Sequence, residues 1–86
     1  MTNHVVLSGK IEKVYDLGEF TLASIRVFDE LFYLFFDSLE YDYKTLEKCY
    51  VCAKGYLQHI RYKLETNVTR TTILAVCVEE MEKCDI

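Results

Sequence analysis

This 86-residue chain has no proline, no tryptophan and only three glycines. A chain that is 51% hydrophobic and free of proline is not intrinsically disordered, because it has enough apolar surface to form a core. Three glycines are too few for a glycine-rich loop that cradles a nucleotide phosphate. No run of about 18 apolar residues occurs, which excludes a transmembrane helix. Residues 1–4 do not resemble the start of a secretory signal peptide, so we expect a cytoplasmic protein without membrane contacts.

Positive charge is also scarce, since ten lysines and arginines face fourteen acids for a net charge of −4. The distribution along the chain is uneven. Residues 1–43 carry a net charge of −5 and residues 71–86 carry −3, whereas residues 44–70 carry +4. A local basic patch can attract a phosphate chain even on an acidic protein. The central third is therefore where the charge pattern predicts contacts with a polyanion.

The residues of catalytic and metal sites are sparse. The two histidines, His4 and His59, are too far apart to suggest a metal pair, and no arrangement of nucleophile and base stands out. The acids fall mainly in predicted turns and near predicted caps, where solvated carboxylates are common. We therefore expect no enzymatic activity, no metal and no cofactor.

The four cysteines allow three interpretations. Cys49 and Cys52 have the C-x-x-C spacing of zinc and redox sites, but they lie at a predicted strand rather than at the start of a helix. Cys77 and Cys84 are too widely spaced for a typical second zinc-binding pair. We favour reduced cysteines that serve as small apolar residues, with a zinc site and a structural disulfide as the alternatives.

Runs rich in Val, Ile, Thr and aromatic residues predict an all-β domain spanning residues 1–86. The five strands are expected at residues 4–15, 20–28, 31–36, 49–58 and 68–81. Gly9 is expected to form a bulge, and Asp29-Glu30 a tight turn. A short helix over residues 37–48, capped by Asp37-Ser38, is expected to plug one end of the barrel, and residues 59–67 to form a polar hairpin tip. This order is that of a five-stranded OB-fold barrel with one short helix between strands 3 and 4.

Four segments in the expected order also carry a family resemblance over nearly the whole chain. They are residues 3–9 in the first strand, 20–23 in the second, 46–57 around Lys48 and Gly55, and 71–75 in the last. With these segments the chain resembles bacterial single-stranded-DNA-binding proteins, and its opening also resembles the related primosomal replication proteins. The resemblance implies single-stranded DNA as ligand, a role in replication, repair or recombination, and a homodimer or homotetramer with replication proteins as possible partners.

The resemblance also implies where the DNA would bind. The family stacks bases on aromatic side chains at positions that correspond here to Phe28, Phe32, Phe36 and Tyr62. From the residues alone, basic and aromatic side chains interleave over residues 54–63, a pattern typical of surfaces that bind phosphates while stacking bases. The complete predicted nucleic-acid-binding set is Arg26, Phe28, Phe32, Phe36, Lys54, Tyr56, His59, Arg61, Tyr62, Lys63 and Arg70.

The chain departs from the family in three respects. It has no tryptophan at the stacking positions, although phenylalanine and tyrosine still offer a π face. Glu30-Leu31 stands where the family has Trp-His. The family's Gly/Pro-rich tail with its acidic tip, which recruits partner proteins, is missing from this sequence.

Residues 31–36 place large apolar groups on both faces of one strand, but a small barrel has only one inner face. The outward half must meet solvent, a ligand or another subunit. A stacking platform for bases and a dimer interface are both compatible with this pattern, and they can coexist. A further hypothesis is an OB-fold protein-interaction module with little or no nucleic-acid binding, which the acidic net charge favours.

Overall fold

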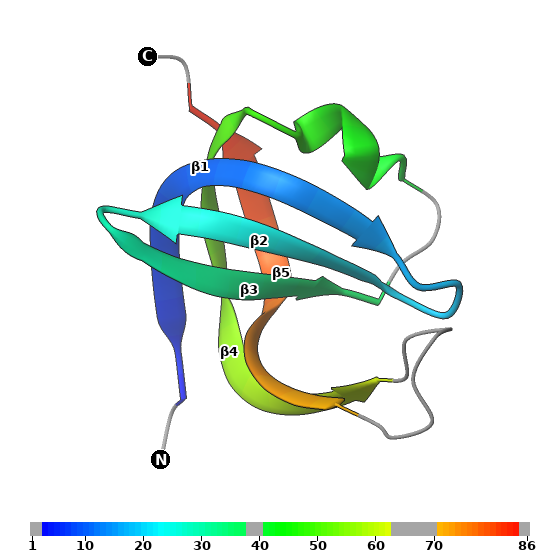
Figure 1. Ribbon diagram of the computed structural model, residues 1–86. Coiled ribbons are helices and arrows are strands. Elements are labelled where there is room, and N and C mark those ends of the chain that lie inside the picture. Colours follow the sequence, from blue (N-terminus) through cyan, green and yellow to red (C-terminus); the bar gives the residue numbers. More distant parts are fainter. Residues whose placement is uncertain (1–2, 38–40, 63–70, 85–86) are drawn as a thin grey trace.

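The computed structural model describes residues 3–37, 41–62 and 71–84. The elements are β1 (Val5–Asp16), β2 (Thr21–Val27), β3 (Glu30–Phe36), the 3₁₀ turn η1 (Tyr43–Leu46), β4 (Tyr50–Tyr62) and β5 (Thr71–Lys83). The strands close into one barrel in the order β1-β2-β3-β5-β4 (Figure 1). The predicted all-β class, with a five-stranded barrel of the OB type, is confirmed.

Strand β1 joins the two halves of the barrel. Its residues 5–10 pair antiparallel with β4, and its residues 10–16 pair antiparallel with β2. Gly9 lies at this crossing, where a Cβ atom would overlap the carbonyl oxygen of Arg26 on β2. Glycine is needed there for close backbone approach. The bulge predicted at Gly9 is found instead between Ile11 and Lys13.

The barrel interior is filled by apolar, mostly aliphatic side chains from all five strands and by Leu46 of η1. The buried cluster comprises Ile11, Val14, Ala23, Ile25, Leu34, Phe36, Leu46, Val51, Ala53 and Val76. Strand alternation sends every second side chain inward, so one face of each strand serves the core. Leu46 is 1% exposed, which shows that η1 covers part of the interior as expected of the element between β3 and β4.

The predicted helix over residues 37–48 is wrong. The described part of this segment contains only the 3₁₀ turn Tyr43–Leu46, and the predicted cap residue Ser38 lies outside the described residues. The Asp42 side chain accepts a hydrogen bond from the Lys44 N–H at 3.2 Å, and the Thr45 hydroxyl donates to the Asp42 carbonyl at 2.9 Å. Such local side-chain bonds favour a tight turn over a longer helix.

The distal parts of β4 and β5 form an arm that curls under β3 (Figure 1). This β4–β5 arm consists of residues 56–62 paired with residues 71–77. Its buried residues Ile60, Ala75 and Cys77 pack against Phe20, Tyr33, Phe35 and Ile73. Because Tyr33 and Phe35 alternate with the core residues of β3, the arm covers part of the outer face of β2 and β3.

Most strand boundaries differ from the predicted ones by one to three residues, but β4 ends four residues later than predicted. The predicted hairpin tip at residues 59–67 is therefore wrong for residues 59–62, which continue the ladder to Tyr62. Residues 63–70 lie outside the described residues. The packing of Ile60 against the outer face of β3 supplies a physical reason for the longer strand.

Candidate nucleic-acid interface

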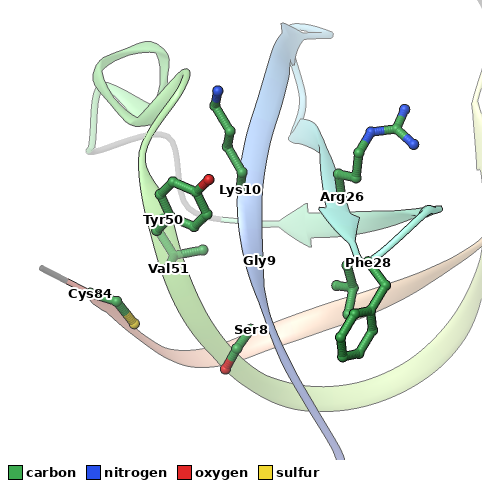
Figure 2. A pocket seen from close by; sticks show the side chains of 9 residues that line it. Ser8, Gly9, Lys10, Arg26, Phe28, Tyr50, Val51 and Cys84 are labelled. Carbon is green, nitrogen blue, oxygen red and sulfur yellow. The ribbon is translucent and has the colours of Figure 1, made fainter. Parts of the chain in front are cut away.

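Three neighbouring strands present one aromatic and two basic side chains side by side. Lys10 on β1 is paired with Tyr50 on β4 and with Arg26 on β2. Directly opposed residues share a face, with Cβ atoms about 4.5–5.5 Å apart. Figure 2 shows the three side chains leaving the sheet in the same general direction. We call Tyr50, Lys10 and Arg26 the outer row.

The outer row borders a pocket of about 550 Å³ that is open to solvent. Its wall is built by residues 8–10 of β1, residues 26–28 at the end of β2, the first two residues of β4 and Cys84. Tyr50 is 44% exposed, so part of its ring is accessible. A concave, largely apolar wall with a few polar groups is typical of ligand-binding sites.

Phe28 lies at the tip of the β2–β3 hairpin, where it lines the same pocket (Figure 2). It has a φ of 56° and is 95% exposed. The hairpin turn is Phe28-Asp29, one residue earlier than predicted. Positive φ is rare for a bulky residue, and glycine, asparagine or aspartate is usual at such turns. Residues with strained backbone angles cluster at functional sites, so Phe28 is a candidate for ligand contact.

The guanidinium of Arg26 is held by two groups. Its Nε and Nη2 atoms donate to the two carboxylate oxygens of Glu12, and its Nη1 atom donates to the Asp29 carbonyl at 3.3 Å. The hydrogen bond from Arg26 holds the pKa of the Glu12 carboxyl below its usual value, and the same bond raises the pKa of Arg26. Arg26 is therefore charged and oriented before any ligand arrives.

Lys54 and Tyr56 continue the face of Tyr50 along β4. By strand alternation they share its side of the sheet, with Lys54 roughly 13 Å and Tyr56 roughly 20 Å from Tyr50 at about 3.3 Å per residue. Lys54 lies between Val6 on β1 and Glu80 on β5. Tyr56 is 40% exposed and stands opposite Cys77. This face of β4 therefore carries Tyr50, Lys54 and Tyr56, and the acidic residue Glu80 lies beside it on β5.

Cys77 is the buried neighbour of Tyr56 on the β4–β5 arm. Burial raises the pKa of the Cys77 thiol, which keeps it neutral at physiological pH. Its Sγ atom lies 3.5 Å from the Gln58 side-chain oxygen and donates a weak hydrogen bond to it. This thiol is therefore a packing group of the arm and contributes no charge to the face.

Phe36 is not a stacking residue in this structure. It is 4% exposed and stacks on Tyr43 inside the barrel, with ring centroids 4.2 Å apart. Alternation along β3 turns it inward together with Leu34, so a base cannot reach its face. The prediction for Phe36 is corrected to a core role. Phe32, which pairs with Ile25, is 36% exposed and does not line the pocket.

The predicted basic and aromatic surface over residues 54–63 is split. His59 and Arg61 are exposed, but they lie on the opposite face of β4 from Lys54 and Tyr56 because the strand alternates. The side chain of Tyr62, together with Lys63 and Arg70, lies outside the described residues. Among the predicted residues whose side chains the structure describes, only Arg26 and Phe28 line the pocket.

Two residues of the outer row were not predicted. Lys10 lies in the acidic first half of the chain, and Tyr50 lies between two cysteines. Neither stands out by composition or local pattern. They meet only because the β1–β4 and β1–β2 registers both include Lys10. A prediction of strand pairing from the OB order could have found them.

The cysteines and acids form no metal centre within the part of the chain that the structure describes. Cys49, Cys52, Cys77 and Cys84 are free thiols, and no group of three or more His, Cys, Asp or Glu residues there could hold a metal ion. Within the same described ranges, no helix has the length and apolarity needed to cross a bilayer.

Neither the family models nor the curated proteins compared with this chain include a match. The assignment of the site therefore depends on the geometry and chemistry of the residues above.

Proposed function

We propose that this protein binds single-stranded DNA without strong sequence preference and performs no chemistry on it. Tyr50 and Phe28 would stack on bases, while Lys10 and Arg26 would contact phosphates and Lys54 would extend the site. The observation that carries this proposal is the outer row beside the pocket, which combines a ring and two cations on one face of an OB barrel.

The energetics of such a site are sufficient for useful affinity. Stacking contributes about 1–3 kcal/mol per base, and it tolerates any base because every base has a π face. Three full phosphate contacts set a limiting slope of about −2 in log K against log salt concentration, at about −0.7 per contact for single strands. Between 50 and 200 mM salt this slope corresponds to roughly a 20-fold loss of affinity.

The position of the β4–β5 arm favours the pocket over the usual OB binding face. OB-folds commonly bind oligonucleotides on the face formed by strands 2 and 3. In this protein the arm packs on that face, and Tyr33 and Phe35 are already partly covered by Ile60, Ala75 and Cys77. Their rings therefore offer less area to a base than the ring of Phe28 does.

The sequence resemblance supports the biological part of the proposal. By that resemblance the protein would act in replication, repair or recombination as a homodimer or homotetramer. The acidic net charge of −4 predicts that affinity depends on the local cations of the site and not on the overall charge.

The proposal is tested by titrating a fluorescently labelled oligo(dT) at 50 and 200 mM salt. Tyr50→Ala should weaken binding by about 5- to 150-fold, the loss of one stacked base. Tyr50→Phe should retain binding. The control Tyr15→Ala removes a comparably exposed tyrosine on β1 that does not line the pocket, and it should have no effect. Absence of binding by the wild-type protein, or binding that is insensitive to salt and to Tyr50→Ala, would refute the proposal.

A second candidate is a protein-interaction module, and one observation favours it. Leu57 and Leu74 are 37% and 51% exposed, and by strand register they lie on the same face of the β4–β5 arm. Exposed leucines of this kind suit a protein interface. In that case the oligonucleotide titration gives no binding, while Leu74→Ser weakens association with a protein partner.

A further inference from the structure

The arrangement of Glu12 around Arg26 matches the way an arginine holds a phosphate. Both carboxylate oxygens of Glu12 accept hydrogen bonds from one edge of the guanidinium, through Nε and Nη2. A phosphate presents two oxygens to the same fork of donors. The edge of Arg26 that would bind a phosphate is therefore already occupied by a carboxylate of the protein.

We propose that Glu12 is an internal competitor for the phosphate that Arg26 would bind, and that it weakens the affinity of the protein for single-stranded DNA. This inference rests on the function proposed above. Glu12 acts through Arg26 and does not itself contact the ligand. The ligand group concerned is a single phosphodiester next to the base that would stack at the pocket.

The backbone places Glu12 in this position. The β1–β2 register skips Glu12, because Ile11 pairs with Ile25 and Lys13 pairs with Ser24. Glu12 is thus the extra residue of a bulge, and bulges commonly redirect a side chain. Glu12 also lies two residues from Lys10, the residue that pairs with Arg26, so alternation along β1 places Glu12 on the same face as Lys10 and diagonal to Arg26.

The contact can be exchanged for a phosphate. The side chains of Arg26 and Glu12 are 42% and 40% exposed, so water competes with the pair and its loss disturbs no core contact. The Asp29 carbonyl still accepts a hydrogen bond from Nη1, which leaves the guanidinium oriented when the carboxylate departs. Arg26 also faces Lys10 across the strands, and that second cation favours an incoming anion.

The test is to measure oligo(dT) affinity for Glu12→Gln at several salt concentrations. We expect binding about two- to fivefold tighter than wild type at 50 mM salt, which corresponds to removing one exposed ion pair. The slope of log K against log salt concentration should become more negative than in wild type, toward the limit of about −2 for three full contacts, because Arg26 would then engage a phosphate fully. Glu19→Gln removes the same charge at an exposed site in the β1–β2 turn and serves as the matched control.

A double-mutant comparison separates competition from a general charge effect. In an Arg26→Gln background the benefit of Glu12→Gln should largely vanish, because no arginine remains to be released. If wild type binds DNA but Glu12→Gln binds no tighter than Glu19→Gln, the inference is wrong and the proposed function stands. If neither wild type nor Glu12→Gln binds oligo(dT), both are wrong.

Discussion

Replacing Phe28 with glycine should stabilise the fold and weaken DNA binding at the same time. The left-handed backbone at φ 56° costs a bulky residue about 1–2 kcal/mol, and glycine adopts it without that cost. Glycine also loses about 0.5–1 kcal/mol more conformational entropy on folding. The ring is 95% exposed, so its removal forfeits almost no burial. The net gain in unfolding free energy is roughly 0.5–1 kcal/mol.

A gain of this size is measurable by thermal unfolding. For a domain of this length, 1 kcal/mol corresponds to about 4–8 °C, so Phe28→Gly should raise Tm by about 2–8 °C. Oligo(dT) affinity should fall by about 5- to 150-fold if the ring stacks on a base. Phe28→Leu is the control for the π face, because it keeps the strained backbone and an apolar side chain.

Two results would contradict this reasoning. A lower Tm for Phe28→Gly would mean that the ring contributes to folding and that the turn is not strained. Unchanged DNA affinity in both Phe28→Gly and Phe28→Leu would mean that Phe28 does not contact the DNA. The predicted combination, higher stability with weaker binding, is the trade-off expected when a strained residue is kept for function.

The remaining predictions concern the frame of the site. Gly9→Ala should destabilise the protein by about 1–3 kcal/mol in urea unfolding, because the new methyl group overlaps the carbonyl oxygen of Arg26; an unchanged midpoint would refute this close approach. Phe36→Ala should cost about 3–5 kcal/mol of stability and leave the DNA affinity of the folded fraction unchanged; a selective loss of binding would restore the stacking role. The pKa of Glu12, followed by NMR, should lie below its usual value in wild type and rise toward that value in Arg26→Gln. Because that pKa is lowered, stability from the pair is present above the usual pKa of glutamate and is lost as pH falls through the lowered value.

The class of fold was accessible from the sequence, because it depends on local patterns. Runs of β-branched and aromatic residues marked five strands, and their order matched one barrel topology. The length of β4 could not be predicted from the sequence, because residues 59–62 form a largely polar segment. The strand continues there because Ile60 packs on the outer face of β3, a contact between residues far apart in the chain. The longer helix failed for a local reason, the bonds that Asp42 makes within a tight turn.

The site was only partly accessible because it depends on register. Phe28 was expected from the family resemblance and Arg26 belonged to the predicted binding set, and both line the pocket. Lys10 and Tyr50 join them only through pairings between residues far apart in the chain. Register also explains why the stacking role predicted for Phe36 was wrong. Side chains alternate along β3, and the register of β3 directs Phe36 into the core.

The central claim is that single-stranded DNA meets the outer row and the pocket beside it. The most direct measurement is a titration of ¹⁵N-labelled protein with oligo(dT), followed through the backbone amide shifts. We predict that the largest changes occur at residues 8–10, 26–28 and 50–51. Changes confined to Tyr33, Phe35 and the β4–β5 arm, or no changes at all, would contradict the account.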